Sequence, residues 1–82
     1  MIRLHPHARV RLAERGVTAE EVAGTIRDGD PFVAKLGRAG FRHNFVYNAN
    51  WLGRFYATKQ VEVIAVREGK DWLVITVIAR FF

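Results

Sequence analysis

The chain divides into a front with helical periodicity and a back rich in β-branched apolar runs. Residues 6–15 (PHARVRLAER) consist largely of good helix formers, which predicts the first helix. Pro6 suits the first helical turn, where its missing N–H costs nothing, and Gly16 stands where a glycine C-cap belongs. We therefore expect this helix to begin near Pro6 and to end at Gly16.

A second helix is expected over residues 19–28. Thr18 and Glu21 have the spacing of a capping box, in which each side chain accepts a hydrogen bond from the backbone N–H of the other residue. Val17 precedes the cap and is placed to pack against Val22 as a hydrophobic staple. The two predicted helices are thus short and meet at Gly16 and Val17.

Beyond residue 30 the pattern changes to β-branched and aromatic runs. The runs 61–66 and 72–79 are the clearest, and the tight connection at 68–71 predicts that they pair as a hairpin. The second run is almost wholly apolar, which is typical of a central strand covered on both faces. Residues 48–50 (Asn-Ala-Asn) favour a turn. Further extended segments are expected at 32–36, at 41–47 and, interrupted by Gly53, at 51–57.

These elements predict an α+β fold in a single domain spanning residues 1–82. We expect two N-terminal helices, near 6–15 and 19–28, packed on one face of a mainly antiparallel sheet of about four strands. The chain has no internal repeat and no linker long enough to separate two domains.

The composition excludes several kinds of chemistry. There is no cysteine, so disulfides, thiolate zinc sites, iron–sulfur clusters and cysteine nucleophiles are excluded. No stretch approaches the ~18 uninterrupted apolar residues of a membrane-spanning helix, and the charged start lacks the apolar run of a signal peptide. We expect a cytoplasmic protein that needs no membrane and no cofactor.

The chain is basic, with 13 Lys and Arg against 8 Asp and Glu and a net charge of +5. Ten of these cations are arginine, whose planar guanidinium group pairs bidentately with phosphate or carboxylate. The charge favours an anionic partner, either a nucleic acid or an acidic protein. Solubility, or a genome biased towards arginine, is the alternative explanation.

Three side chains of the first predicted helix form a basic stripe. His7, Arg11 and Arg15 fall within about 80° of one another around the helix axis, beside the apolar positions Ala8 and Leu12. The stripe therefore borders the buried face and is a candidate anion-binding site. Alternatively, the two arginines pair with nearby glutamates or strand carbonyls, and His7 only caps a turn.

The other histidines offer fewer possibilities. Strand alternation places His43 on one face with three aromatic residues, where it is either a general acid/base or a hydrogen-bonded edge residue. His5 and His7 flank a proline and suggest a metal site, but zinc needs a third ligand and His43 is the only other histidine. We therefore expect no metal site.

One extended motif covers the front of the chain, His7-Ala8-x-x-Arg11-x-x-x-Arg15-Gly16-Val17-Thr18-x-Glu20-Glu21-Val22, and Val74-Ile75-Thr76-Val77 follows late in the sequence. This pattern resembles a family of small bacterial domains of unknown function that is related to the BrnT-like and RelE-like toxins of type II toxin–antitoxin pairs. The resemblance covers residues 4–30 closely and 60–78 loosely, and it does not extend to 31–59.

The resemblance implies two N-terminal helices on a small antiparallel sheet, as the patterning also predicts. It further implies ribonuclease activity without a metal, neutralised by an antitoxin, and it gives functional roles to His7, Arg11, Arg15 and Thr76. RNA cleavage through the 2′-hydroxyl needs proton transfer and stabilisation of a charged phosphorane, for which histidine and arginine are suited.

The leading hypothesis is a small toxin-like protein that interacts with RNA as a metal-independent endoribonuclease, with RNA and an acidic antitoxin as partners. The candidate catalytic residues are His7, Arg11, Arg15 and His43. The candidate substrate-binding residues are Arg11, Arg15, Thr76 and Arg80. The alternatives are a non-enzymatic basic binding module and an accessory domain of a phage or mobile element.

Overall fold

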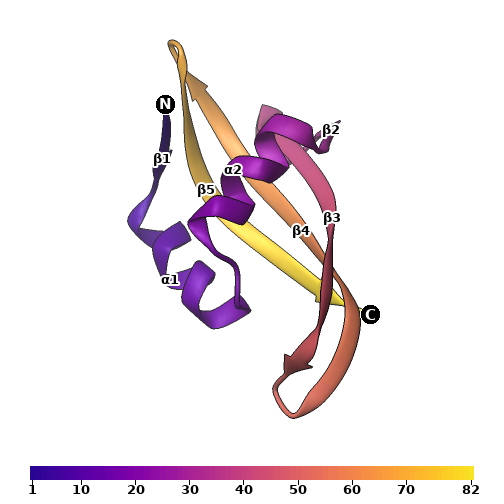
Figure 1. Ribbon diagram of the computed structural model, residues 1–82. Coiled ribbons are helices and arrows are strands. Elements are labelled where there is room, and N and C mark those ends of the chain that lie inside the picture. Colours follow the sequence, from indigo (N-terminus) through magenta and orange to yellow (C-terminus); the bar gives the residue numbers. More distant parts are fainter.

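The computed structural model describes residues 1–82 and has an α+β architecture (Figure 1). A short 3-10 turn at Lys35–Gly37 links the second and third strands. In chain order the elements are β1 (Ile2–Leu4), α1 (Pro6–Arg15), α2 (Ala19–Asp28), β2 (Asp30–Val33), β3 (Ala39–Trp51), β4 (Arg54–Glu68) and β5 (Asp71–Phe81).

The sheet has five strands in the order β1-β5-β4-β3-β2 and is mixed. The prediction of about four antiparallel strands is wrong in this respect, because β1 adds a fifth strand that runs parallel to β5. Ile2 lies opposite Trp72, and Leu4 lies opposite Val74. A strand therefore precedes the helices, and all the other pairings in the sheet are antiparallel.

The predicted bounds of both helices are confirmed, and the caps explain them. Gly16 ends α1 in the left-handed conformation, at φ 64°, and its N–H donates to the carbonyl of Leu12. Both hydrogen bonds of the capping box between Thr18 and Glu21 are present at the start of α2. At the start of α1 it is the His5 side chain that accepts a hydrogen bond, from the backbone N–H of His7.

The strands β3 and β4 form one long hairpin that extends beyond the rest of the molecule (Figure 1). The turn expected at 48–50 is wrong: Asn48 has a φ of 45°, but it lies within β3, where the pairing register with β4 shifts. The chain reverses at Leu52 and Gly53, both with positive φ. Consequently the segments predicted at 51–57 and 61–66 mostly form a single strand, β4, which pairs with β5 as expected.

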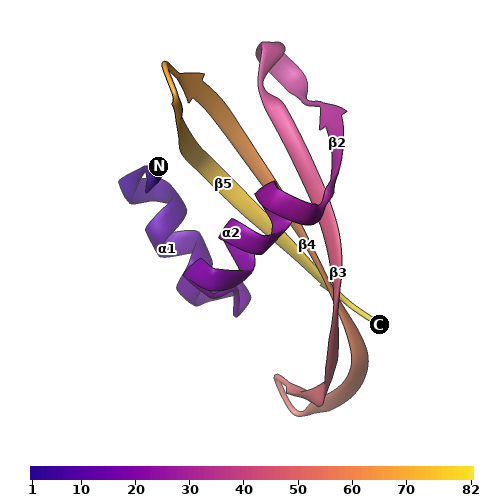
Figure 2. The same ribbon diagram turned by 45° about the horizontal axis from the view of Figure 1, so that its top comes forward.

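Both helices pack on the same face of the sheet, α1 mainly over β5 and α2 over β3 and β4 (Figure 1, Figure 2). The opposite face has no helix on it, so the expectation that the last strand is covered on both faces is wrong. Neither helix has the length and apolar character needed to cross a membrane. The core between helices and sheet consists of Ala8, Val17, Val22, Val61, Val63, Ala65, Val74 and Val77.

Lys59, a buried cation on β4, fixes the corner between the two helices to the sheet. Its ammonium group donates to the carbonyl oxygen of Gly16 at 2.6 Å and to the Glu21 carboxylate at 2.9 Å. It also lies 5.0 Å from the centre of the Tyr47 ring, within the range of a cation–π contact. Because Glu21 belongs to the capping box, one carboxylate serves both the start of α2 and the anchoring of the helices.

Candidate functional site

The basic stripe of α1 is largely occupied by contacts within the protein. Arg11 forms an ion pair with Glu14 on the same helix, and Arg15 donates a hydrogen bond to the backbone carbonyl of Val77 in β5. The alternative interpretation, in which these arginines pair with a glutamate and a strand carbonyl, therefore describes both contacts. His7 is exposed, and its ring makes no hydrogen bond.

His43 lies apart from this stripe. It is on β3, where its ring packs edge-to-face against Phe45 with 4.9 Å between the centroids. The charge of His43 acts on the carboxylate of Asp28, at the end of α2. The pKa of Asp28 is lowered mainly by its hydrogen bond from Arg27 and more weakly by the charge of His43. The protein contains no group of three His, Asp or Glu side chains that could hold a metal ion.

The predicted site residues are thus divided between the two faces of the sheet. His7, Arg11 and Arg15 lie on α1, over the strand β5. Thr76 and Arg80 lie on the opposite, uncovered face, since they alternate along β5 with residues that point towards the helices. The structure therefore does not bring the six predicted residues together, and the uncovered face is a separate candidate site.

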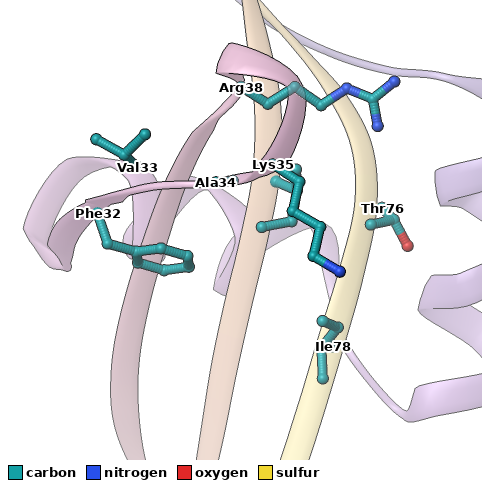
Figure 3. Close-up of a pocket in the computed structure, with 8 residues that line it drawn as sticks. Phe32, Val33, Ala34, Lys35, Arg38, Thr76 and Ile78 are labelled. Atoms are coloured by element: carbon teal, nitrogen blue, oxygen red, sulfur yellow. The ribbon is translucent and has the colours of Figure 1, made fainter.

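The uncovered face contains a hollow of about 420 Å³ beside β2 (Figure 3). It is bounded by β2, by the turn that follows β2, and by the middle of β4 and β5. Five of its eight lining residues are hydrophobic, so the hollow is mainly apolar. The lining residues are Phe32, Val33, Ala34, Lys35, Arg38, Ile64, Thr76 and Ile78.

Gly40 of β3 allows the Phe32 ring to lie directly on the sheet beside this hollow. A Cβ atom on Gly40 would lie only 2.4 Å from two carbon atoms of that ring, a distance that real contacts do not reach. The absence of a side chain on β3 therefore determines where the ring lies. The guanidinium group of Arg42 packs against the same ring, 4.8 Å from its centroid.

Polar groups without partners surround the apolar floor of the hollow. Lys35 extends across its mouth towards Thr76 and Ile78, and Arg38 projects above it (Figure 3). Neither of these cations forms an ion pair with a carboxylate. The Thr76 hydroxyl makes no hydrogen bond within the protein, and its oxygen points away from Lys35 (Figure 3). These groups are available to a ligand.

Next to the hollow is the Arg42–Glu62–Arg80 cluster, which joins β3, β4 and β5. The Glu62 carboxylate accepts a hydrogen bond from Arg42 at 2.8 Å and from Arg80 at 2.7 Å. The Glu62 side chain is 7% exposed, whereas those of Arg42 and Arg80 are 46% and 53% exposed. One buried carboxylate thus holds two half-exposed guanidinium groups close together, and the cluster has a net charge of +1.

Strand register places the cluster and the hollow side by side. Across the three central strands, the row formed by Gly40, Ile64 and Thr76 is followed, two residues along, by the row of Arg42, Glu62 and Ile78. Both rows point to the uncovered face, because side chains two residues apart in a strand share a face. The two features therefore form one continuous basic and apolar surface.

The electrostatics of Glu62 reflect a balance of opposing effects. Burial raises the pKa of this carboxyl group, but hydrogen bonds from Arg42 and Arg80, together with their charges, outweigh burial and hold the pKa below its usual value. Glu62 is accordingly ionised at neutral pH and keeps both guanidinium groups in place.

Acid is expected to weaken the fold through Glu62. Because its pKa is lower in the folded than in the unfolded protein, its contribution is complete above about pH 4.3 and is lost as the pH falls through the folded pKa. Urea unfolding at a series of pH values should show this loss in the wild type and a smaller loss in Glu62→Gln. Glu20→Gln, at an exposed carboxylate without an ion pair, is the matched control. Equal pH dependence in Glu62→Gln and the wild type would contradict the prediction.

Sequence reasoning selected Arg80 and Thr76 on this face but missed Phe32, Arg42 and Glu62. Arg42 and Glu62 are twenty residues apart, and they meet only because β3 and β4 pair in one register. The alternation around residues 41–47 contained a partial signal, since it places Arg42 on the face opposite His43.

No family model matches the chain, and neither a curated protein nor a solved structure matches it. The resemblance to the toxin-related family therefore stays a prediction that depends on the motif alone. The function has to be inferred from the chemistry of the surface itself.

Proposed function

We propose that this protein binds RNA through the uncovered face of its sheet. The observation that carries the proposal is the Arg42–Glu62–Arg80 cluster, in which a buried carboxylate presents two half-exposed guanidinium groups. Guanidinium groups held in this way pair with phosphate at little further cost in side-chain entropy. Lys35 and Arg38, which lack ion-pair partners, extend the positive charge to the hollow.

The arrangement favours a binding module over an endoribonuclease. Cleavage requires groups that move protons, and His5, His7 and His43 all lie outside the cluster and the hollow. In the stripe predicted to be catalytic, Arg11 forms an ion pair with Glu14, and Arg15 donates a hydrogen bond to the backbone of β5. Endoribonuclease activity and an acidic antitoxin partner stay predictions from the resemblance.

Binding can be measured with a short fluorescent RNA over a range of salt concentrations. We expect the logarithm of the affinity to fall linearly with the logarithm of the salt concentration, because contacted phosphates release counterions. Arg42→Ala and Arg80→Ala should each flatten the slope by about one contact. The same samples, examined for RNA integrity in the presence of a chelator, report any cleavage.

Arg9→Ala is the matched control, because Arg9 is an exposed arginine on α1 and has no ion-pair partner. It removes the same charge from the other side of the molecule and should leave most of the slope intact. A slope that responds to Arg9→Ala or Arg11→Ala, but not to changes at Arg42 and Arg80, would reject the uncovered face as the binding surface. Circular dichroism should show that each variant is folded.

A further inference from the structure

We infer that the hollow beside Phe32 accepts one unpaired nucleobase, so that the RNA ligand is single-stranded where it crosses the sheet. This inference rests on the proposed function, because it assigns the substrate class of the same surface. The base contacts the floor of the hollow, whereas the charged side chains beside the hollow contact the phosphates.

The hollow has the size and lining of a small-ligand site. Its volume of about 420 Å³ lies within the roughly 300–1,000 Å³ of such sites, which are mainly apolar with a few placed polar groups. Phe32, Ile64 and Ile78 supply apolar contact, and the Phe32 ring is held on the sheet by the space that Gly40 leaves. The floor is therefore built into the sheet, whereas the rim with Lys35 and Arg38 belongs to the turn that follows β2.

The polar groups around the hollow match the remaining parts of a nucleotide. The Thr76 hydroxyl can donate or accept, so after a change of its side-chain rotamer it can bind the edge of a base whose faces contact the apolar floor. Lys35 and Arg38 at the mouth are placed for the phosphate that precedes or follows that base (Figure 3). The next phosphate along the strand meets Arg42 and Arg80, in the adjoining row of the sheet.

This combination distinguishes a single strand of RNA from other anionic ligands. A flat apolar group alternating with single negative charges is the repeating unit of an unpaired strand, and such strands bind by base stacking and backbone charge together. A base inside a duplex has both faces covered by its neighbours and cannot enter the hollow. An acidic peptide would satisfy the arginines but presents no flat group for the apolar floor.

The test compares three RNAs of equal length: a single strand, the corresponding duplex, and a single strand with abasic positions. We expect the wild type to bind the single strand most tightly. Its affinity for the abasic strand should be about 5- to 150-fold lower, which corresponds to the loss of one stacked base. Phe32→Leu should reduce the difference between intact and abasic strands while leaving the salt slope unchanged. Thr76→Val, which keeps the side-chain shape, should weaken only the intact strand, by about 2- to 10-fold.

Val46→Ala is the control, because Val46 is an exposed apolar residue on the same face of β3 outside the hollow. Equal affinity for all three RNAs would overturn the base site while leaving RNA binding intact. Failure to bind any of them would overturn the proposed function itself. If poly-glutamate binds as tightly as the single strand and depends equally on Phe32, the hollow is a peptide site and the inference is wrong.

Discussion

Replacing Lys59 with methionine is expected to lower the free energy of unfolding by about 3 kcal/mol, because removing one partner of a buried ion pair leaves the other charge uncompensated. Lys59 is 4% exposed, and its ammonium group holds both the carbonyl of Gly16 and the carboxylate of Glu21. Methionine is unbranched and preserves most of the length and apolar contacts of the side chain, but it cannot donate these hydrogen bonds. The loss therefore reports the hydrogen bonds and the charge, and equilibrium unfolding in urea measures it.

Lys70→Met is the matched control for this change. Lys70 lies exposed in the turn between β4 and β5 and forms no ion pair, so the same substitution should alter stability by no more than about 0.5 kcal/mol. Similar losses for Lys59→Met and Lys70→Met would show that Lys59 does not anchor the helices. In that case Thr18→Ala should cost the same free energy of unfolding in the wild type and in Lys59→Met. Because Thr18 and Lys59 both contact Glu21, an anchoring Lys59 would instead make the two costs differ.

Gly29→Ala is expected to destabilise the protein by about 3 kcal/mol, which is at the upper end of the usual range for overpacking. A Cβ atom at this position would lie 2.4 Å from the carbonyl oxygen of Thr25 and 2.7 Å from that of Arg42. Both are backbone atoms, so the end of α2 has to move away from β3 to make room. Thermal or urea unfolding would show the loss.

Gly24→Ala, in the same helix, should have the opposite sign. The nearest atoms to its added Cβ are Arg27 Nη2 at 3.7 Å and the Phe45 ring at 3.8 Å, which are ordinary contacts. Alanine is about 1 kcal/mol more favourable than glycine inside a helix, so stability should rise by up to that amount. Loss of stability in Gly24→Ala, or none in Gly29→Ala, would contradict this account of how α2 packs on the sheet.

The bounds of the two helices were predictable, because the residues that determine them lie close together in the sequence. The capping box at Thr18 and Glu21 and the glycine after Arg15 set the helix bounds through backbone chemistry within four residues. The β1 strand gave no such signal, since three residues are too few for a pattern and their partner lies about seventy positions away. The turn between β3 and β4 could not be recognised in the sequence, because Leu52 adopts a positive φ that is usual for glycine or asparagine.

The candidate site was harder to predict for a similar reason. The spacing of His7, Arg11 and Arg15 does produce a stripe on one helix, but spacing cannot reveal that Glu14 and the carbonyl of Val77 are their partners. The cluster of Arg42, Glu62 and Arg80 exists only across three paired strands. Sequence patterns identify what one element presents, whereas this surface depends on the register between elements.

The pairing of β1 with β5 also has a consequence for the order of folding during synthesis. The residues with which Ile2–Leu4 pairs, Trp72–Val74, are made about seventy residues later than Ile2–Leu4 itself. At typical translation rates this delay is on the order of seconds, which is long compared with helix formation. During that time α1 and α2 can form, but the strand to which β1 binds does not yet exist. The final edge of the sheet is therefore added after translation of β5, and the nascent chain has to keep this short apolar segment from pairing elsewhere.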